Sequence, residues 1–387
     1  RDGRTPILEY SVTRWGIRYA WTMFAATLDG DPRSPLFAFV RIVVSNPGAG
    51  SGQARLGVAV RHQNAPRSTA RMRADPESPF RFRSWYAIED GVISRDERAL
   101  LFLPDEPKPA LGATLEAPYT GPFQGAAHDV VEWTPVCPTT WAFELEPGQG
   151  RAVDLVVPLV PVQDADRVRV HEQVDGAFDA VLAKTEERWQ AHFDRAIDLR
   201  LPELKAHDVF WTSVANIAIA RDQVQEDIWV QRVNELQYHT GFWPRDASYF
   251  AMAWWYLGMP DEGRRVIDHY FRIQNDDGSF QHDPENISPF AIARWFRLTG
   301  DLEYAKRAFP FLWRNHLWLK ARRAEDPLHL MPSRGRYDNE GIEGHYVGHN
   351  FYNLCALREG AELARALGKV EEAEALEREY TDYRETF

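Results

Sequence analysis

The sequence has few cysteines, no long apolar run and no excess of positive charge. Each of these absences argues against one class of protein. The two cysteines, Cys137 and Cys355, lie far apart and have no spacing typical of a metal or redox site. No run approaches the roughly 18 apolar residues of a transmembrane helix, and the first residues lack the order of a signal peptide. We therefore expect a soluble protein. The sequence does not fix its cellular location, although it slightly favours the cytoplasm.

The charge balance argues against anionic partners. Lys and Arg number 45 and Asp and Glu number 57, which gives a formal net charge of −12. Such a charge opposes broad attraction to phosphate backbones or to anionic lipid. We expect neither nucleic acid nor a membrane as a partner, and the sequence leaves the oligomeric state open.

The composition of the 387 residues changes near residue 170. Of the 25 prolines, 17 lie at or before Pro161, whereas ten of the twelve histidines lie at or after His171. The length allows two or three domains. We expect a first domain over residues 1–169, a helical connector over 170–203 and a second domain over 204–387.

The first part is typical of antiparallel β-structure. Short runs rich in Val, Phe, Tyr and Trp are separated by clusters of Gly, Pro, Asn and Asp, and this spacing predicts a β-sandwich. One run, Leu36–Ser45, has so few polar positions that we expect it to be covered on both faces. The predicted strands are Tyr19–Thr27, Leu36–Ser45, Ala54–Arg61, Phe80–Ile88, Ala99–Leu103, Thr140–Leu145 and Ala152–Leu159.

From about Val170 the apolar residues recur with a helical period. Prolines open several of the helices, glycines end them, and Pro310 is expected to kink or divide one. Tight turns and long loops join the helices alternately, which is typical of a toroid of helical hairpins. The predicted helices are Val174–Leu199, Asp208–Ile219, Pro244–Leu257, Pro260–Ile273, Ser288–Gly300, the segment from Asp301 to about Arg323, His349–Leu367 and Val370–Arg384.

Three long loops, residues 234–246, 277–284 and 336–346, combine aromatic rings with forked polar side chains. A sugar needs both, because its C–H faces stack on aromatic rings while its hydroxyls need paired donors and acceptors. Loops on one face of a helical toroid can line a pocket. The candidate sugar-binding residues in and beside these loops are Tyr238, His239, Trp243, Arg245, Asp246, Gln281, His282, Tyr337 and His349.

The segment Phe242–Tyr249 and the helical residues after it resemble the tryptophan, any residue, arginine, aspartate segment of glucoamylase-type enzymes in the six-hairpin glycosidase superfamily. The resemblance spans about residues 205–387. It implies an α+β multidomain fold, an N-terminal antiparallel β-sandwich followed by an (α/α)6 toroid. It also implies that Arg245 and Asp246 grip the hydroxyls of the terminal sugar.

A later stretch, from Tyr337 through Asn353 to Ala364, resembles the segment that carries the general acid in these enzymes, and the equivalent segment of disaccharide phosphorylases. The resemblance implies that Glu340 is the acid, and a small insertion would shift this role to Glu343. The Trp-Glu-Glu grouping common in glucoamylases is absent, and Asn339-Glu340-Gly341-Ile342-Glu343 stands in its place.

Glycoside hydrolysis needs a second carboxyl group as base or nucleophile. In the resembling enzymes the base lies late in a barrel of twelve helices, of which about four are missing here. We therefore expect the toroid to be incomplete at its C-terminal end and the base to lie beyond residue 387. The resemblance thus implies an inverting, exo-acting hydrolase of an oligosaccharide or polysaccharide end, and we expect no cofactor.

Several alternatives remain open at this point. The same fold could carry a glycoside phosphorylase, a lyase acting on uronic-acid polymers or a sugar-binding module without chemistry. Arg245 and Asp246 could form a local ion pair in the first turn of a helix, and Glu340 and Glu343 could be solvated loop carboxylates. The histidines lack a ligand spacing of known pattern, so we expect no metal.

Overall fold

The structure is a computed structural model, and it describes residues 1–31, 33–60, 83–95, 97–111, 127–131, 136–225, 228–233, 242–281, 283, 286–332, 334–337 and 342–387. These residues form two compact units. The first comprises Arg1–Phe193 and Leu201–Thr212, and the second comprises Asp194–Arg200 and Ser213–Phe387. Within the described residues, no helix is both long enough and apolar enough to cross a bilayer.

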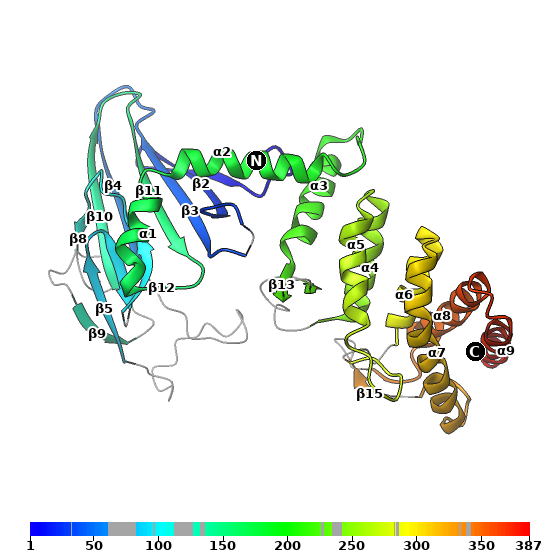
Figure 1. Cartoon of the computed structure of the whole chain (residues 1–387). Helices are drawn as coiled ribbons and strands as arrows, with labels where there is room; N and C mark the ends of the chain where they lie inside the picture. The colour runs from blue at the N-terminus through cyan, green and yellow to red at the C-terminus, as the bar shows by residue number, and fades with distance from the viewer. Residues whose placement is uncertain are drawn as a thin grey trace. The chain divides into compact units, whose positions relative to one another are not determined.

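The first unit is built on antiparallel sheets (Figure 1). In the described part of the chain, the larger sheet has nine strands, with β12 (Val162–Gln163) pairing with β7 beside the main order. A smaller sheet has the order β4 (Gly52–Val60), β10 (Val136–Leu145), β8 (Ala110–Leu111). The main order of the larger sheet is β1 (Leu8–Arg14), β2 (Ile17–Thr27), β3 (Leu36–Ser45), β11 (Gly150–Pro158), β7 (Arg98–Phe102), β6 (Val92–Arg95), β5 (Arg83–Glu89) and β9 (Ala127–Val131).

Strand β3 is covered on both faces, as its lack of polar positions predicts. Phe39 lies in a buried cluster with Phe178 of the following helical segment. Val44, which points to the opposite face because side chains alternate along a strand, lies in a second cluster with Trp141 of β10. The second cluster contains residues of the larger and the smaller sheet, so the two sheets share one core.

Two helices follow the sheets, and the second lies within the helix that the sequence predicts over Val174–Leu199. Helix α1 (Arg167–Val174) ends and helix α2 (Phe178–Phe193) begins on either side of Gly176. Gly176 has a φ of +68°, in the left-handed region that glycine adopts readily and that ends a helix. The predicted helix is therefore wrong in its bounds, since it starts before Gly176 and runs past Phe193, where α2 ends, and α1 was not predicted.

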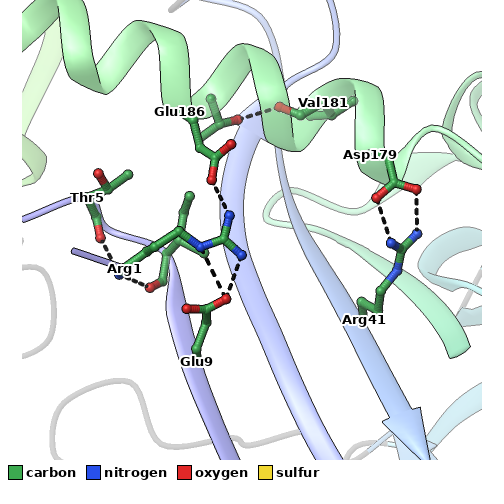
Figure 2. A network of polar contacts seen from close by, with 9 residues as sticks. Arg1, Thr5, Glu9, Arg41, Asp179, Val181 and Glu186 are labelled. Atoms are coloured by element: carbon green, nitrogen blue, oxygen red, sulfur yellow. Dashed lines mark hydrogen bonds and ion pairs between the residues drawn. The ribbon is translucent and has the colours of Figure 1, made fainter. Parts of the chain in front are cut away.

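Ion pairs tie α2 to the larger sheet at two points (Figure 2). Arg41 of β3 donates a hydrogen bond of 2.6 Å to Asp179 in the first turn of α2. In the middle of the helix, the guanidinium of Arg1 bonds to Glu186 of α2, and it also bonds to Glu9 of β1. The helix is thus held by charge on its exposed edge as well as by its buried apolar face.

The second unit is mostly helical. Helix α3 (Leu204–Ile219) has residues in both units, and a short hairpin of β13 (Arg221–Gln225) and β14 (Ile228–Gln231) follows it. Helix α5 packs against α4, α7 against α6 and α9 against α8, while α6 contacts both α4 and α8. This repetition of helix pairs agrees with the predicted helical hairpins. The bounds are α4 (Pro244–Tyr256), α5 (Pro260–Tyr270), α6 (Ser288–Thr299), α7 (Leu302–Glu325), α8 (Val347–Ala366) and α9 (Val370–Thr386).

Local signals set most of these helix ends. Pro244 and Pro260 occupy the first positions of α4 and α5, where the missing N–H costs no hydrogen bond. Gly300 ends α6 with a φ of +67°, and the Asp301 carboxylate then accepts a 2.9 Å hydrogen bond from the N–H of Tyr304. Pro310 lies inside α7 and does not divide it.

Candidate active site

The first turn of α4 presents the predicted Arg245 and Asp246 to solvent. Their side chains are 39% and 33% exposed, and Trp243 at the N-cap is 38% exposed. A carboxylate here is favoured by the helix dipole. Arg245 Nε lies 3.9 Å from Asp246 Oδ2, a distance too long for a hydrogen bond. The two charges are therefore neighbours, yet their contact with each other is not a tight local ion pair.

Beneath this turn, hydroxyl groups hold the carbonyl oxygen of Pro244. Tyr270 Oη donates to it over 2.8 Å and Ser248 Oγ over 2.7 Å, and the two hydroxyls are 2.7 Å apart. Both side chains are fully buried, and Phe242 lies edge-on to the Tyr270 ring. Burial raises the pKa of Tyr270 well above its usual value, with the nearby carboxylates Asp283 and Asp246 adding to the effect.

A buried carboxylate organises the start of α6. Asp283 accepts hydrogen bonds from the backbone N–H groups of Ile287 (3.0 Å) and Ser288 (2.7 Å). Burial raises the pKa of Asp283, although these hydrogen bonds oppose the shift. Predicted site residue Gln281 lies two positions earlier and is exposed. Asp283 thus fixes the entry to α6 from inside the unit.

The start of α8 is ordered by a second buried carboxylate. Asp326 Oδ2 lies 2.8 Å from His345 Nε2. Burial opposes ionisation of Asp326, but hydrogen bonds from His345 and from backbone N–H groups outweigh it and lower the pKa. In the next turn, the predicted site residue His349 is buried and stacks on Tyr346, with ring centroids 4.9 Å apart. Glu343, in the short strand β16 (Ile342–Gly344), is exposed.

Contacts between aromatic rings bring the N-terminal halves of α4, α6 and α8 together. The hydroxyls of Tyr249 on α4 and Tyr352 on α8 contact each other, and the Tyr352 ring lies 5.9 Å from that of Phe290 on α6. Phe290 belongs to a buried cluster with Ile287 and Ala356, and Tyr352 packs beside that cluster. The starts of these three helices, which carry most of the described candidates, therefore lie in one region of the second unit.

The other candidates lie in the segments before α4, α6 and α8 in the sequence. Tyr238, His239, His282 and Glu340 lie outside the described residues. The backbone of Tyr337 ends strand β15 (Arg334–Tyr337) and pairs with Ile342 of β16. In the part of the chain that the structure describes, no group of three His, Cys, Asp or Glu side chains could hold a metal ion.

The sequence interpretation missed the buried groups that support this region. Tyr270 and Asp326 bond to partners 26 and 19 residues away, so no local pattern marks these contacts. Ser248 bonds to Pro244 within the same helix and carries no pattern specific to a site. Asp283 lacked a capping signal, because it stands five residues before Ser288, beyond the two or three residues that an N-cap side chain spans.

No protein-family model and no curated protein matches the sequence. Among solved structures, a bacterial glucoamylase complexed with acarbose is similar with a TM-score of 0.58 and 11% identity, over 99% of this chain and 57% of that chain. A putative kojibiose phosphorylase from the human microbiome is similar with a TM-score of 0.46 and 8% identity, over 100% of this chain and 56% of that one. The chain thus spans little more than half the length of either. It has a glucoamylase-like α+β fold, with an N-terminal antiparallel sheet followed by helices.

Proposed function

We propose that the chain is part of a carbohydrate-active enzyme that binds a terminal sugar at the starts of α4, α6 and α8. The observation that carries the proposal is the first turn of α4. There a guanidinium and a carboxylate, Arg245 and Asp246, stand partly exposed beside exposed aromatic surface from Trp243 and, one turn later, Tyr249, which is 50% exposed. Forked polar groups beside flat rings suit the hydroxyls and C–H faces of a sugar.

The proposed architecture is an N-terminal β-sandwich over residues 1–169, a connector over 170–203 and the first part of an (α/α)6 toroid over 204–387. The glucoamylase-like fold supports this arrangement, and its pairs of helices are of the kind that such a toroid repeats. Function on a shared fold is decided by the site. The proposal therefore depends on Arg245, Asp246 and the carboxylates Glu340 and Glu343, which precede α8 in the sequence, rather than on likeness alone.

The proposed reaction is hydrolysis of a glycosidic bond at a chain end with inversion. Arg245 and Asp246 hold the hydroxyls of the terminal sugar, and protonated Glu340 gives its proton to the leaving oxygen. A carboxylate beyond residue 387 activates the attacking water on the opposite face. If Glu340 is not the acid, Glu343 takes that role, three residues later in the sequence.

The test is to incubate the full-length protein with α-glucosides and β-glycosides, with and without phosphate. Free sugar of inverted configuration supports the proposal. Sugar phosphate formed only with phosphate present indicates a phosphorylase, and an unsaturated product indicates a lyase. Sugar binding without turnover indicates a binding module. Absence of both binding and turnover across the panel contradicts a role in carbohydrate chemistry.

A further inference from the structure

Three helices of the second unit each carry a buried tyrosine whose hydroxyl reaches a neighbouring helix. Tyr270 of α5, Tyr304 of α7 and Tyr383 of α9 are each at most 1% exposed. Tyr304 Oη donates to the carbonyl of Ile292, in the middle of α6, over 3.0 Å. Tyr383 Oη donates to the side chain of Asn350 on α8 over 2.7 Å. Tyr270 differs from both because its acceptor is a backbone carbonyl at the very start of α4.

That acceptor has an unusual position in the site. The carbonyl of Pro244 belongs to the peptide group whose nitrogen is that of Arg245. A peptide group is planar and rigid, so fixing its oxygen also fixes the direction in which the chain enters Arg245 and Asp246. Two buried hydroxyls fix this oxygen, Tyr270 Oη at 2.8 Å and Ser248 Oγ at 2.7 Å.

The two hydroxyls differ in the elements that their hydrogen bonds connect. Ser248 lies on α4 itself, so its bond to Pro244 is made within the helix. Tyr270 lies at the end of α5, and its bond sets the first turn of α4 against a separate element. Phe242, which precedes this turn in the sequence and is 8% exposed, packs edge-on against the Tyr270 ring.

We propose that Tyr270 is a positioning residue, which orients Arg245 and Asp246 for sugar binding by holding the Pro244 peptide from beneath. This inference rests on the proposed function for the role of the pair, and on the hydrogen bonds for the positioning. Tyr270 is buried and does not touch the sugar. Its effect on binding passes through the Pro244 peptide.

The experiment compares Tyr270→Phe with Tyr304→Phe in the full chain. Each variant keeps its ring and loses one buried hydroxyl that donates to a backbone carbonyl, so both should lose similar stability. The first measurement is hydrogen exchange of the peptide covering residues 243–249. The second is affinity for acarbose by calorimetry.

We expect Tyr270→Phe to speed exchange in this peptide and to weaken acarbose binding about three- to tenfold, the scale of one neutral hydrogen bond. Tyr304→Phe should change neither. Equal changes in both variants, or none in Tyr270→Phe, would overturn the proposal. If wild type does not bind acarbose, the sugar assignment fails with this probe, and the exchange comparison alone decides whether Tyr270 positions the turn.

If Tyr270→Phe does not fold, Ser248→Ala provides the second variant, since it removes the other hydroxyl that holds the same oxygen. Faster exchange in residues 243–249 with weaker acarbose binding then supports the positioning of this peptide. Unchanged exchange and affinity in Ser248→Ala overturn it.

Discussion

At the scale of single residues, Asp246 is the most direct test of the proposed sugar site. We expect Asp246→Ala to reduce turnover by about 10²-fold or more, because a lost hydrogen bond to the reacting sugar is felt in the transition state. The fold should remain intact, since this side chain is one third exposed. Steady-state kinetics together with a thermal melt measure both effects.

The matched control for this prediction is Asp261→Ala. Asp261 is also an exposed carboxylate in a first turn opened by proline, that of α5. Both variants lose a similar favourable interaction with a helix dipole, about 0.3–1 kcal/mol. Turnover by Asp246→Ala that matches Asp261→Ala would remove Asp246 from the sugar site.

Glu340 has a different signature because a general acid matters only when the leaving group needs a proton. We expect Glu340→Gln to lose about 10²–10⁴-fold on an ordinary disaccharide and to retain activity on a glycosyl fluoride, whose leaving group departs without protonation. Glu343→Gln should affect both substrates little. If Glu343→Gln shows the selective loss instead, Glu343 is the acid, whereas equal losses on both substrates from Glu340→Gln indicate a binding role.

The sequence could indicate which side chains of the proposed site are exposed. It could not indicate which buried groups hold them in place. Trp243, Arg245 and Asp246 follow from a local pattern, a proline that opens a helix after an aromatic loop. The support from Tyr270 depends on a hydrogen bond between residues 26 positions apart. Such a bond exists only once α5 has packed against α4, so no pattern of neighbouring residues can reveal it.

At the scale of elements, prediction succeeded where a local signal ends a helix and failed where none was recognised. Pro260 and the Gly300-Asp301 pair set boundaries through their own backbone preferences. Strand β1 was not predicted, although Leu8, Tyr10 and Val12 alternate along it. These side chains remain exposed, so the strand owes its place to pairing with β2 and to the stacking of Tyr10 on Trp21 rather than to burial.

The packing of three helices depends on a glycine that no sequence signal marked. A Cβ at Gly263 of α5 would lie 2.7 Å from the carbonyl oxygen of Ala251 on α4 and 2.7 Å from the Trp295 ring on α6. We expect Gly263→Ala to cost about 1–3 kcal/mol of unfolding free energy, as overpacking of a core does. Urea denaturation measures the loss.

Gly360→Ala is the control for this substitution. Gly360 is also buried in a helix, α8, but a Cβ there would meet Leu376 Cδ1 at 3.8 Å, an ordinary contact. Because alanine favours helix over glycine by about 1 kcal/mol, this variant should be as stable as wild type or more stable. Equal destabilisation by both substitutions would mean that close helix approach at Gly263 is not the cause.

At the scale of the whole molecule, one buried carboxylate joins separate stretches of the second unit. Glu262 of α5, 2% exposed, bonds to Arg195, to Arg221 of β13 and to Arg265. Burial opposes its ionisation, but the charges and hydrogen bonds of the arginines, Arg221 foremost, outweigh this and lower the pKa of Glu262 to about 2.

Because the folded pKa lies below the usual value of 4.5, the stability that Glu262 contributes is complete above about pH 4.5 and is lost as the pH falls towards 2. We expect Glu262→Gln to be less stable than wild type by about 3 kcal/mol at pH 7, with the difference shrinking below pH 4.5. Urea unfolding midpoints at pH 7, 4 and 2.5 test this. A difference that stays constant with pH would contradict the assignment.

Glu303→Gln is the control for this pH series. Glu303 pairs with Lys306 at the surface of α7 and its side chain is 83% exposed. A pair of this kind contributes about 0–1 kcal/mol, so the variant should follow wild type closely at every pH.

The chain passes from the first unit to the second, back to the first and again to the second within residues 193–213. This path limits where gene recombination could join two related chains. Residues 194–200 belong with the second unit, where the Ile197 N–H bonds to the carbonyl of Leu257. Residues 201–212, which follow them, belong with the first, where the Thr212 hydroxyl bonds to the carbonyl of Gly3. A single crossover anywhere in 194–212 therefore leaves at least one of these stretches packed against a unit that comes from the other parent chain. We expect chimaeras of related chains to tolerate exchange only when 194–212 are inherited together with both of their native counterparts.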